Sequence, residues 1–320
     1  MNAYLPDSLS IICYLITFLV TTLLLGFLIT RLPSLSLARV SAWLLALLAV
    51  IGVERLCKEE PAGLRMLAII GVLFYSMKAV VTVEAQAAGK DRLKPLQWFG
   101  FAAGWFGMRP YIFSSLGKPP VAQAASLLWL GIKRLGLGLL LILLAWLLFS
   151  SFNTILNDGF VRLVVTLLLL IGLSLMLHFG ILNIFAATWR YFGVNCNQLF
   201  IAPLMSTSLS EFWGRRWNMA FSEMTSISVY RPLIPLLGKQ VAAVIAFLFS
   251  GLLHELAISV PVKLGFGLPL AYFMLHGILV IIERKLEQLG WPIYRIKWLG
   301  RTWTIFWLTL PMPILFHKYF

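Results

Sequence analysis

One stretch of the chain places ionisable side chains where an apolar environment is expected. The run "FLFSGLLHELAISV", residues 247–260, carries His254 and Glu255 among hydrophobic residues. Ionisable groups inside a membrane span are costly and by default indicate function. An imidazole, with an unperturbed pKa of about 6.5, suits general-base chemistry at neutral pH. The same pair is also compatible with a proton relay in a transporter, or with a structural hydrogen bond between helices.

Zinc chemistry is not predicted for this stretch. A zinc-protease helix needs a second histidine four residues after the first, and that position is Ile258. The three cysteines, Cys13, Cys57 and Cys196, are scattered without a CxxC pair, so we interpret them as free thiols. We therefore predict no metal site.

A second stretch is unusually polar and aromatic for this chain. In "SLSEFWGRRWNMAF", residues 208–221, Ser208 followed by Glu211 has the form of a capping box and predicts a helix from that point. On such a helix Trp213, Trp217 and Phe221 would form one aromatic stripe.

The polar residues of this predicted helix fall on a different face. Glu211, Arg215 and Asn218 follow at i, i+4 and i+7, which would allow an ion pair between Glu211 and Arg215. A helix with one aromatic and one cationic face is typical of the membrane interface. It could be a membrane anchor only, or part of a site.

The elements that position these residues are predicted to be transmembrane helices. The chain has 320 residues, of which 60% are hydrophobic and 12% charged, against about 25% charged in soluble domains. We predict an all-α, polytopic bundle in a single domain, 1–320, with its motif core at 200–260. About eight spans are expected, near residues 9–29, 40–53, 66–84, 135–150, 161–187, 240–260, 266–283 and 302–316.

The stretch 96–130 does not fit a simple span. It contains "LQWFGFAAGWFGMRPYIF", with Arg109 and Pro110 inside an aromatic, Gly-rich sequence. A charged, Pro-interrupted backbone is tolerated at membrane depth only when it is packed in protein. We predict a re-entrant or interfacial segment.

The cations indicate membrane topology. The net charge of +14 comes from Lys and Arg residues that flank apolar helices, so nucleic acid is not predicted as a partner. Cation-rich and cation-poor loops alternate, which places the N-terminus outside or in a lumen and 188–239 in the cytoplasm. No cleavable signal peptide is evident, and either a bacterial inner membrane or an endoplasmic reticulum fits. Phosphorylated ligands and anionic lipids are alternative partners for the same charge.

Together the two stretches resemble a known family. "SLSEFWGRRWN" at 208–218, followed by "SGLLHEL" at 250–256, resembles the wax synthase-like branch of the membrane-bound O-acyltransferases. "GWFGMRPY" at 104–111 is similar to an upstream element of that branch, less specifically. The specific match covers about a fifth of the chain, and larger members of the superfamily have several more spans.

The resemblance implies an activity and a set of site residues. It implies transfer of an acyl group from acyl-coenzyme A, a co-substrate and not a resident cofactor, to a lipophilic alcohol such as a long-chain alcohol. His254 is then the general base and Asn218 its partner. Arg215, Arg216, Arg231, Trp213 and Trp217 would meet the donor, with Glu211, Glu255 and Ser250 in support. No serine or cysteine elbow lies near His254, so direct attack in a ternary complex is simpler than an acyl-enzyme. A transporter or a non-catalytic lipid-binding protein is the alternative, and the oligomeric state stays open.

Overall fold

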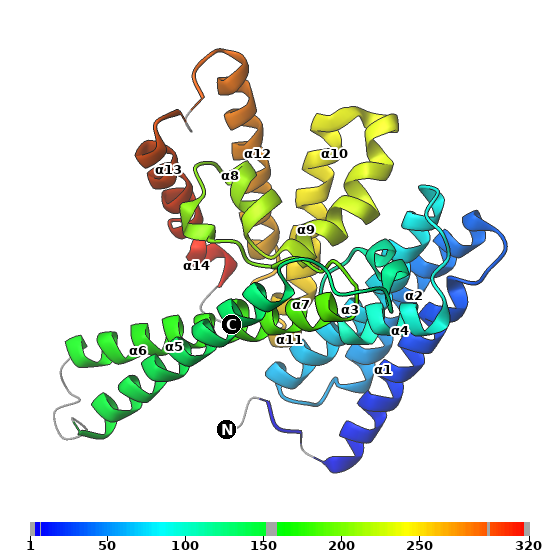
Figure 1. Cartoon of the computed structure of the whole chain (residues 1–320), viewed down its shortest axis with the longest axis horizontal. Helices are drawn as coiled ribbons and strands as arrows, with labels where there is room; N and C mark the ends of the chain where they lie inside the picture. Colours follow the sequence, from blue (N-terminus) through cyan, green and yellow to red (C-terminus); the bar gives the residue numbers. More distant parts are fainter. Residues whose placement is uncertain (1–3, 7, 152–158, 293–294, 317–320) are drawn as a thin grey trace. The chain divides into compact units, whose positions relative to one another are not determined.

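The computed structural model describes residues 4–6, 8–151, 159–292 and 295–316, and they form helices without strands (Figure 1). The predicted all-α class is confirmed. The described chain divides into two compact units, 1–111 with 202–320, and 112–201. The prediction of a single domain stays a prediction.

Three long apolar helices open the first unit. They are α1 (Leu9–Ile29), α2 (Leu35–Leu56) and α3 (Ala62–Ala87), and α3 packs against both of the others (Figure 1). A bidentate ion pair, with both contacts at 2.8 Å, joins Arg39 on α2 to the buried Glu84 on α3. Buried Arg65 on α3 pairs with Glu54 and donates to the carbonyl of Pro261, and so ties α3 to the far end of the helix that carries His254.

The stretch 96–123 forms no long helix. Helix α4 spans Pro95–Gly104 and begins with proline, whose fixed φ suits a first turn. An irregular connection leads to a 3₁₀ turn, Pro110–Ser115. The next long helix starts at Ala124, so residues 124–130 of the predicted stretch 96–130 belong to a candidate membrane span. Over residues 96–123 neither helical segment is long enough to cross a membrane, and the re-entrant or interfacial placement stays a prediction.

The second unit is a helical hairpin. Helix α5 (Ala124–Ser151) packs against α6 (Gly159–Ser174), a π-helical turn (Leu175–Ile181) and α7 (Leu182–Tyr191). Glycines allow this close approach. A β-carbon at Gly138 would lie 2.7 Å from the carbonyl oxygen of Gly172, so neither glycine can be replaced without separating the helices.

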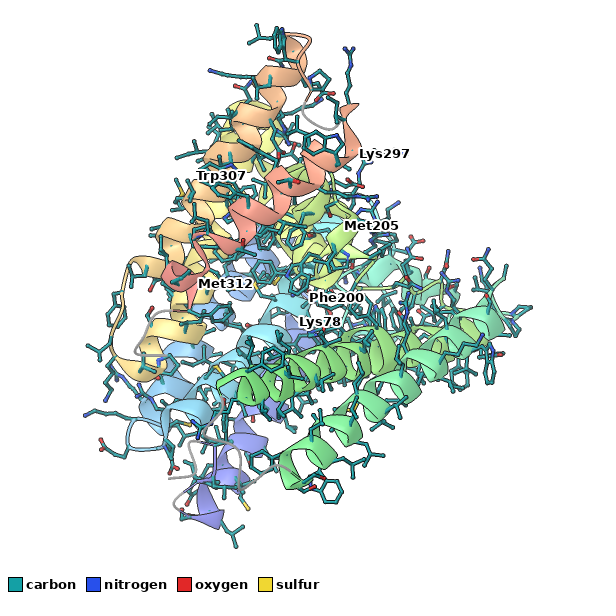
Figure 2. All side chains as sticks on the ribbon, turned by 90° about the vertical axis from the view of Figure 1, so that its left-hand side faces the viewer. Lys78, Phe200, Met205, Lys297, Trp307 and Met312 are labelled. Atoms are coloured by element: carbon teal, nitrogen blue, oxygen red, sulfur yellow. The ribbon has the colours of Figure 1, made fainter. Side chains whose placement is uncertain are left out.

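The rest of the first unit carries the two predicted stretches. It contains α8 (Leu209–Glu211), α9 (Met219–Thr225), α10 (Arg231–His254), α11 (Val260–Val262), α12 (Leu268–Gln288), α13 (Lys297–Thr309) and α14 (Met312–Leu315). Helix α13, which runs between the labelled Lys297 and Trp307 in Figure 2, packs Trp303 and Trp307 against Leu279 and Val280 of α12. The backbone is non-helical at Gly238 (φ 75°), so α10 is kinked there.

Among the described residues six helical runs are long and apolar enough to cross a membrane. They are Leu9–Ile29, Leu35–Leu56, Ala62–Ala87, Ala124–Ser151, Gly159–Tyr191 and Met219–Val262. The chain is an integral membrane protein, and the predicted count of eight is not confirmed. Helix α12 ends in charged residues, and α13 is only 13 residues long, which is shorter than a bilayer requires.

Candidate active site

His254 is the last residue of α10, and its ring is held between two phenylalanines. The ring centroids of Phe273 and Phe221 lie 4.2 Å and 5.2 Å from that of the imidazole. Nδ1 lies 2.7 Å from the carbonyl oxygen of Ser250, one turn earlier in the same helix. A carbonyl oxygen can only accept, so this contact places the proton on Nδ1 and leaves the Nε2 lone pair available.

Glu255 faces away from this ring toward the start of α12. A π-helical turn begins at Glu255. Its Oε1 accepts hydrogen bonds from the backbone N–H groups of Gly267 (2.8 Å) and Leu270 (3.1 Å). The first N–H groups of a helix lack intrahelical partners, and a carboxylate is stabilised there. Glu255 therefore caps α12 and orders the helix that carries Phe273.

The segment 208–221 is not the single helix predicted from its sequence. Ser208 does cap α8, accepting from the N–H of Glu211 at 3.0 Å. Residues Phe212–Arg216 then form a π-helical turn, Trp217 is extended, and Asn218 is left-handed (φ 41°). The helix breaks there because asparagine tolerates the left-handed region that other side chains avoid.

The break overturns the predicted faces. Because a π turn brings residues five apart together, Glu211 pairs with Arg216 (Nε–Oε1, 2.7 Å) and not with Arg215. Phe212 and Trp217, also five apart, stack with ring centroids 5.6 Å apart. The prediction of a continuous aromatic stripe of Trp213, Trp217 and Phe221 was wrong. The prediction that Glu211, Arg215 and Asn218 share one helix face was also wrong.

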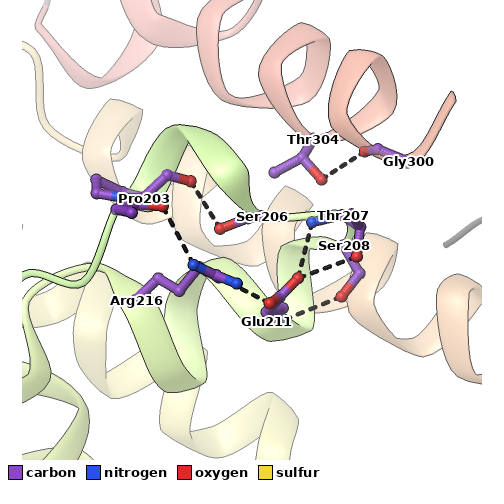
Figure 3. A network of polar contacts seen from close by, with 9 residues as sticks. Pro203, Ser206, Thr207, Ser208, Glu211, Arg216, Gly300 and Thr304 are labelled. Atoms are coloured by element: carbon purple, nitrogen blue, oxygen red, sulfur yellow. Dashed lines mark hydrogen bonds and ion pairs between the residues drawn. The ribbon is translucent and has the colours of Figure 1, made fainter. Parts of the chain in front are cut away.

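A local network of hydrogen bonds around Glu211 and Arg216 holds this segment, as Figure 3 shows. Glu211 Oε2 accepts from the N–H of Thr207 (2.8 Å) and from its hydroxyl (3.0 Å), while Arg216 also reaches the carbonyl of Ala202 (3.4 Å). Burial alone would raise the pKa of the Glu211 carboxyl, but the hydrogen bonds from Thr207 and Arg216 outweigh it and hold the pKa below 4.5.

This network predicts a pH-dependent stability. A carboxyl whose pKa is depressed on folding stabilises the protein above its unfolded pKa, and the stabilisation is lost as pH falls through the folded value. We expect Glu211→Gln to lower the free energy of unfolding in detergent at about pH 7 by roughly 1 kcal/mol or less, which is what a partly exposed ion pair contributes. The loss is measured as a lower melting temperature. The difference from wild type should shrink as the pH falls below 4.5. A difference that stays constant across this range would contradict the ion pair.

Asn218 starts the next helix. Its side-chain oxygen accepts from the N–H of Phe221 at 3.3 Å, which caps α9. With the oxygen assigned to the cap, the amide Nδ2 is directed elsewhere, and the described residues give it no hydrogen-bond partner. The capped turn thus has the Asn218 amide at one end and, at the other, the Phe221 ring that contacts His254.

The aromatic and cationic residues of the segment are distributed over different neighbours. Trp213 lies against α12, with ring centroids 5.4 Å from Phe273 and 5.5 Å from His276. Its carbonyl accepts a hydrogen bond from the Ser222 hydroxyl, which joins the π turn to α9. Arg215 and Arg231 are exposed, so both are accessible to an anionic ligand.

Comparison with known proteins supports the assignment of these residues to one motif. Residues 196–275 match the model of the membrane bound O-acyl transferase family. The predicted resemblance to the wax synthase-like branch is confirmed. Both Asn218 and His254 lie in the matched segment.

Related proteins carry acyltransferase names. A long-chain-alcohol O-fatty-acyltransferase from Simmondsia chinensis is 31% identical over 105 residues, which is 30% of each chain. A probable long-chain-alcohol O-fatty-acyltransferase 2 from Arabidopsis thaliana is 30% identical over 138 residues, 38% of this chain and 40% of the relative. An acyl-CoA–sterol O-acyltransferase 1 from the same plant is 30% identical over 97 residues, 28% of each chain. The matched region is less than half the length of each of these relatives.

Sequence reasoning missed two glutamates that contact the matched segment 196–275 and hold it in place. Glu283 on α12 accepts from the N–H groups of Leu209 (2.7 Å) and Ser210 (3.0 Å) and from the indole N–H of Trp303 (2.9 Å), so it caps α8. Glu223 on α9 pairs with Arg109 at 2.7 Å. Both glutamates lie in amphipathic or apolar helices, and an acidic residue in such a helix was the available signal.

No group of three or more His, Cys, Asp or Glu side chains within the described ranges could hold a metal ion. The arrangement that remains is an imidazole with Nε2 available, an amide donor at the start of the helical turn whose Phe221 ring contacts that imidazole, and exposed arginines. Such an arrangement suits proton abstraction and acyl transfer.

Proposed function

We propose that the protein is a membrane-embedded O-acyltransferase that moves an acyl group from acyl-coenzyme A to a lipophilic alcohol of the long-chain-alcohol class. The observation that carries the proposal is the contact of His254 Nδ1 with the Ser250 carbonyl, which leaves Nε2 to accept a proton. The names of the related acyltransferases support the substrate classes.

In the proposed reaction Nε2 of His254 takes the proton of the alcohol hydroxyl. The alcohol oxygen attacks the thioester carbonyl, and the tetrahedral oxyanion receives a hydrogen bond from Nδ2 of Asn218. The carbon–sulfur bond then breaks, and the departing thiolate takes the proton back from the imidazolium. The ester and coenzyme A leave, and no group remains bound to the protein. Phe221 and Phe273 help to exclude water, which would hydrolyse the thioester.

The donor is expected to approach from the cytoplasmic side. Arg215 and Arg231 are exposed and available to its phosphates, which arginine binds in bidentate geometry. Arg216 is better assigned to the ion pair with Glu211 than to the donor. The acyl chain and the alcohol would lie among apolar helices, where burial carries little desolvation cost.

A coupled assay tests the function. Purified protein in detergent is mixed with labelled acyl-coenzyme A and a fatty alcohol, and free thiol and labelled ester are measured together. An acyltransferase releases one thiol for each ester. Thiol without ester would indicate a thioesterase, and neither product would favour a transporter or a lipid-binding protein.

The proposed topology predicts a labelling pattern. The alternating cations place the N-terminus outside and 188–239 inside. In a Cys13→Ser background, which removes the exposed native thiol, Asn153→Cys should react with an impermeant thiol reagent from outside and Asn195→Cys should not. Asn153 lies outside the described residues, and Asn195 is exposed. The reverse pattern would overturn the topology.

A further inference from the structure

Lys78 on α3 is completely buried and holds a loop in place. Its ammonium group donates to the carbonyl oxygens of Phe101 (2.9 Å), Trp105 (2.6 Å) and Gly107 (2.8 Å), and it lies 3.9 Å from the ring centroid of Phe101. Removing a buried charge from water is expensive, and carbonyl oxygens together with an aromatic face offset that cost. Lys78 therefore fixes the backbone between α4 and Met108.

The loop after Trp105 is closely packed and is also held by Glu223. A β-carbon at Gly107 would collide with the indole of Trp105. The next residue, Met108, donates its backbone N–H to Glu223 Oε2 at 2.9 Å. Arg109 follows, with its Nε 2.7 Å from the other carboxylate oxygen. The backbone at Met108 and the guanidinium of Arg109 are thus held by one carboxylate.

The guanidinium of Arg109 is held at one edge only. Among the described residues its ion-pair contact with Glu223 is made by Nε, and its side chain is 33% exposed. The arginines of the other ion pairs are more fully engaged. Arg39 presents Nε and Nη2 to Glu84, and Arg65 uses both terminal nitrogens. Glu223 therefore orients the guanidinium group of Arg109 through Nε, and the two terminal nitrogens stay available to a ligand.

Two further cations lie within electrostatic range of Glu223 besides Arg109. They are Lys78, which holds the adjoining loop, and the exposed Arg231. An oriented arginine fork matches the geometry of a phosphate group.

We propose that Arg109 is a phosphate-binding residue, oriented by Glu223 and by the loop that Lys78 fixes. We assign the phosphate that Arg109 binds to the coenzyme A head of the acyl donor, and this assignment rests on the proposed function. A phospholipid headgroup presents the same chemistry, so the experiment separates the two sources.

Binding of coenzyme A itself tests the proposal without turnover. Its dissociation constant is measured by calorimetry on purified wild type, Arg109→Ala and Arg39→Ala, with pantetheine, which lacks phosphate, as the second probe. Losing a charge-assisted contact should weaken coenzyme A binding about ten-fold or more in Arg109→Ala. Pantetheine binding should not change. Arg39 is the matched control because it is also an accessible arginine on a buried glutamate, and its removal should leave both affinities unchanged.

Two further variants keep the test decisive. Arg109→Lys keeps a charge for Glu223 without the fork, so it should fold and still lose coenzyme A affinity even if the alanine variant cannot be purified. Glu223→Gln keeps the Arg109 guanidinium but removes the ion pair that orients it. This variant should lose less coenzyme A affinity than Arg109→Ala does. Equal losses for coenzyme A and pantetheine would overturn the proposal, and so would no loss for either probe together with no difference between wild type and Arg109→Ala in the response to phosphatidylglycerol.

A lipid arm identifies the source of the phosphate. If phosphatidylglycerol raises the melting temperature of wild type but not of Arg109→Ala, while coenzyme A affinity is the same in both, Arg109 binds a lipid phosphate and the donor assignment is wrong. The ester assay stays independent of this result. A protein that forms no ester but loses coenzyme A affinity in Arg109→Ala would contradict the proposed function and support the phosphate site.

Discussion

His254→Ala is expected to lower ester formation by about 10²–10⁴-fold, the usual cost of removing a general base. The reason is the tautomer set by Ser250, which leaves Nε2 as the nitrogen that can take the proton of the alcohol. The measurement is kcat for ester formation by purified protein. Because the ring is packed between two phenylalanines, the variant also creates a small cavity, so its melting temperature must be recorded with the rate.

A matched histidine separates chemistry from packing. His178 also lies in an apolar helix, near the hydroxyl of Ser174 at 3.4 Å, and it belongs to the other compact unit. His178→Ala should lose stability without a comparable loss of kcat. If the purified His254 variant kept near-full turnover, His254 would be structural and the proposed mechanism would lose its base.

Asn218→Asp is expected to lower kcat by about 10²–10³-fold, the range seen when one oxyanion donor is removed. Aspartate keeps the side-chain oxygen that caps α9 and tolerates the left-handed backbone at φ 41°. What it lacks is the Nδ2 donor. The melting temperature should therefore stay near that of wild type while the KM for the alcohol changes little and kcat falls.

Alanine at the same position would give an ambiguous result. Asn218→Ala removes the cap and places a strained residue in the left-handed region, so α9 itself would be weakened. The comparison of Asp with Ala distinguishes a donor from a cap. A kcat for Asn218→Asp equal to that of wild type, with a large loss in Asn218→Ala, would show that Asn218 serves only to start the helix.

Local patterns in the sequence predicted much of the fold. Apolar length was enough for the long helices because a bilayer demands it, and Ser208 identified the start of α8 because capping depends on neighbours within one turn. The pairing of Glu211 failed because it assumed a 3.6-residue repeat. The hydrogen-bond register of the turn decides which residues meet, and residue types alone do not give that register.

Long-range contacts were beyond the reach of the sequence. Glu283 and Leu209 are 74 positions apart, and Met108 and Glu223 are 115 apart. The sequence around Glu283 or Glu223 does not show which distant backbone N–H group will donate a hydrogen bond to it. The same limit hid Lys78, which reads as one cation in an apolar helix and is in fact the group that orders a loop.

The π turn at Phe212–Arg216 has a consequence for how relatives of this chain are aligned. A π turn holds one residue more than the α turn it replaces, which makes it equivalent to a single-residue insertion. A β-carbon at Gly214 would meet no neighbouring atom within 4 Å, so no neighbour requires a glycine in this turn. In a relative that is one residue shorter within the turn, the residues equivalent to Glu211 and Arg216 would be four residues apart and could pair on an ordinary helix. A one-position gap in this motif is therefore compatible with the same ion pair, and spacing alone should not be used to exclude a chain from the family.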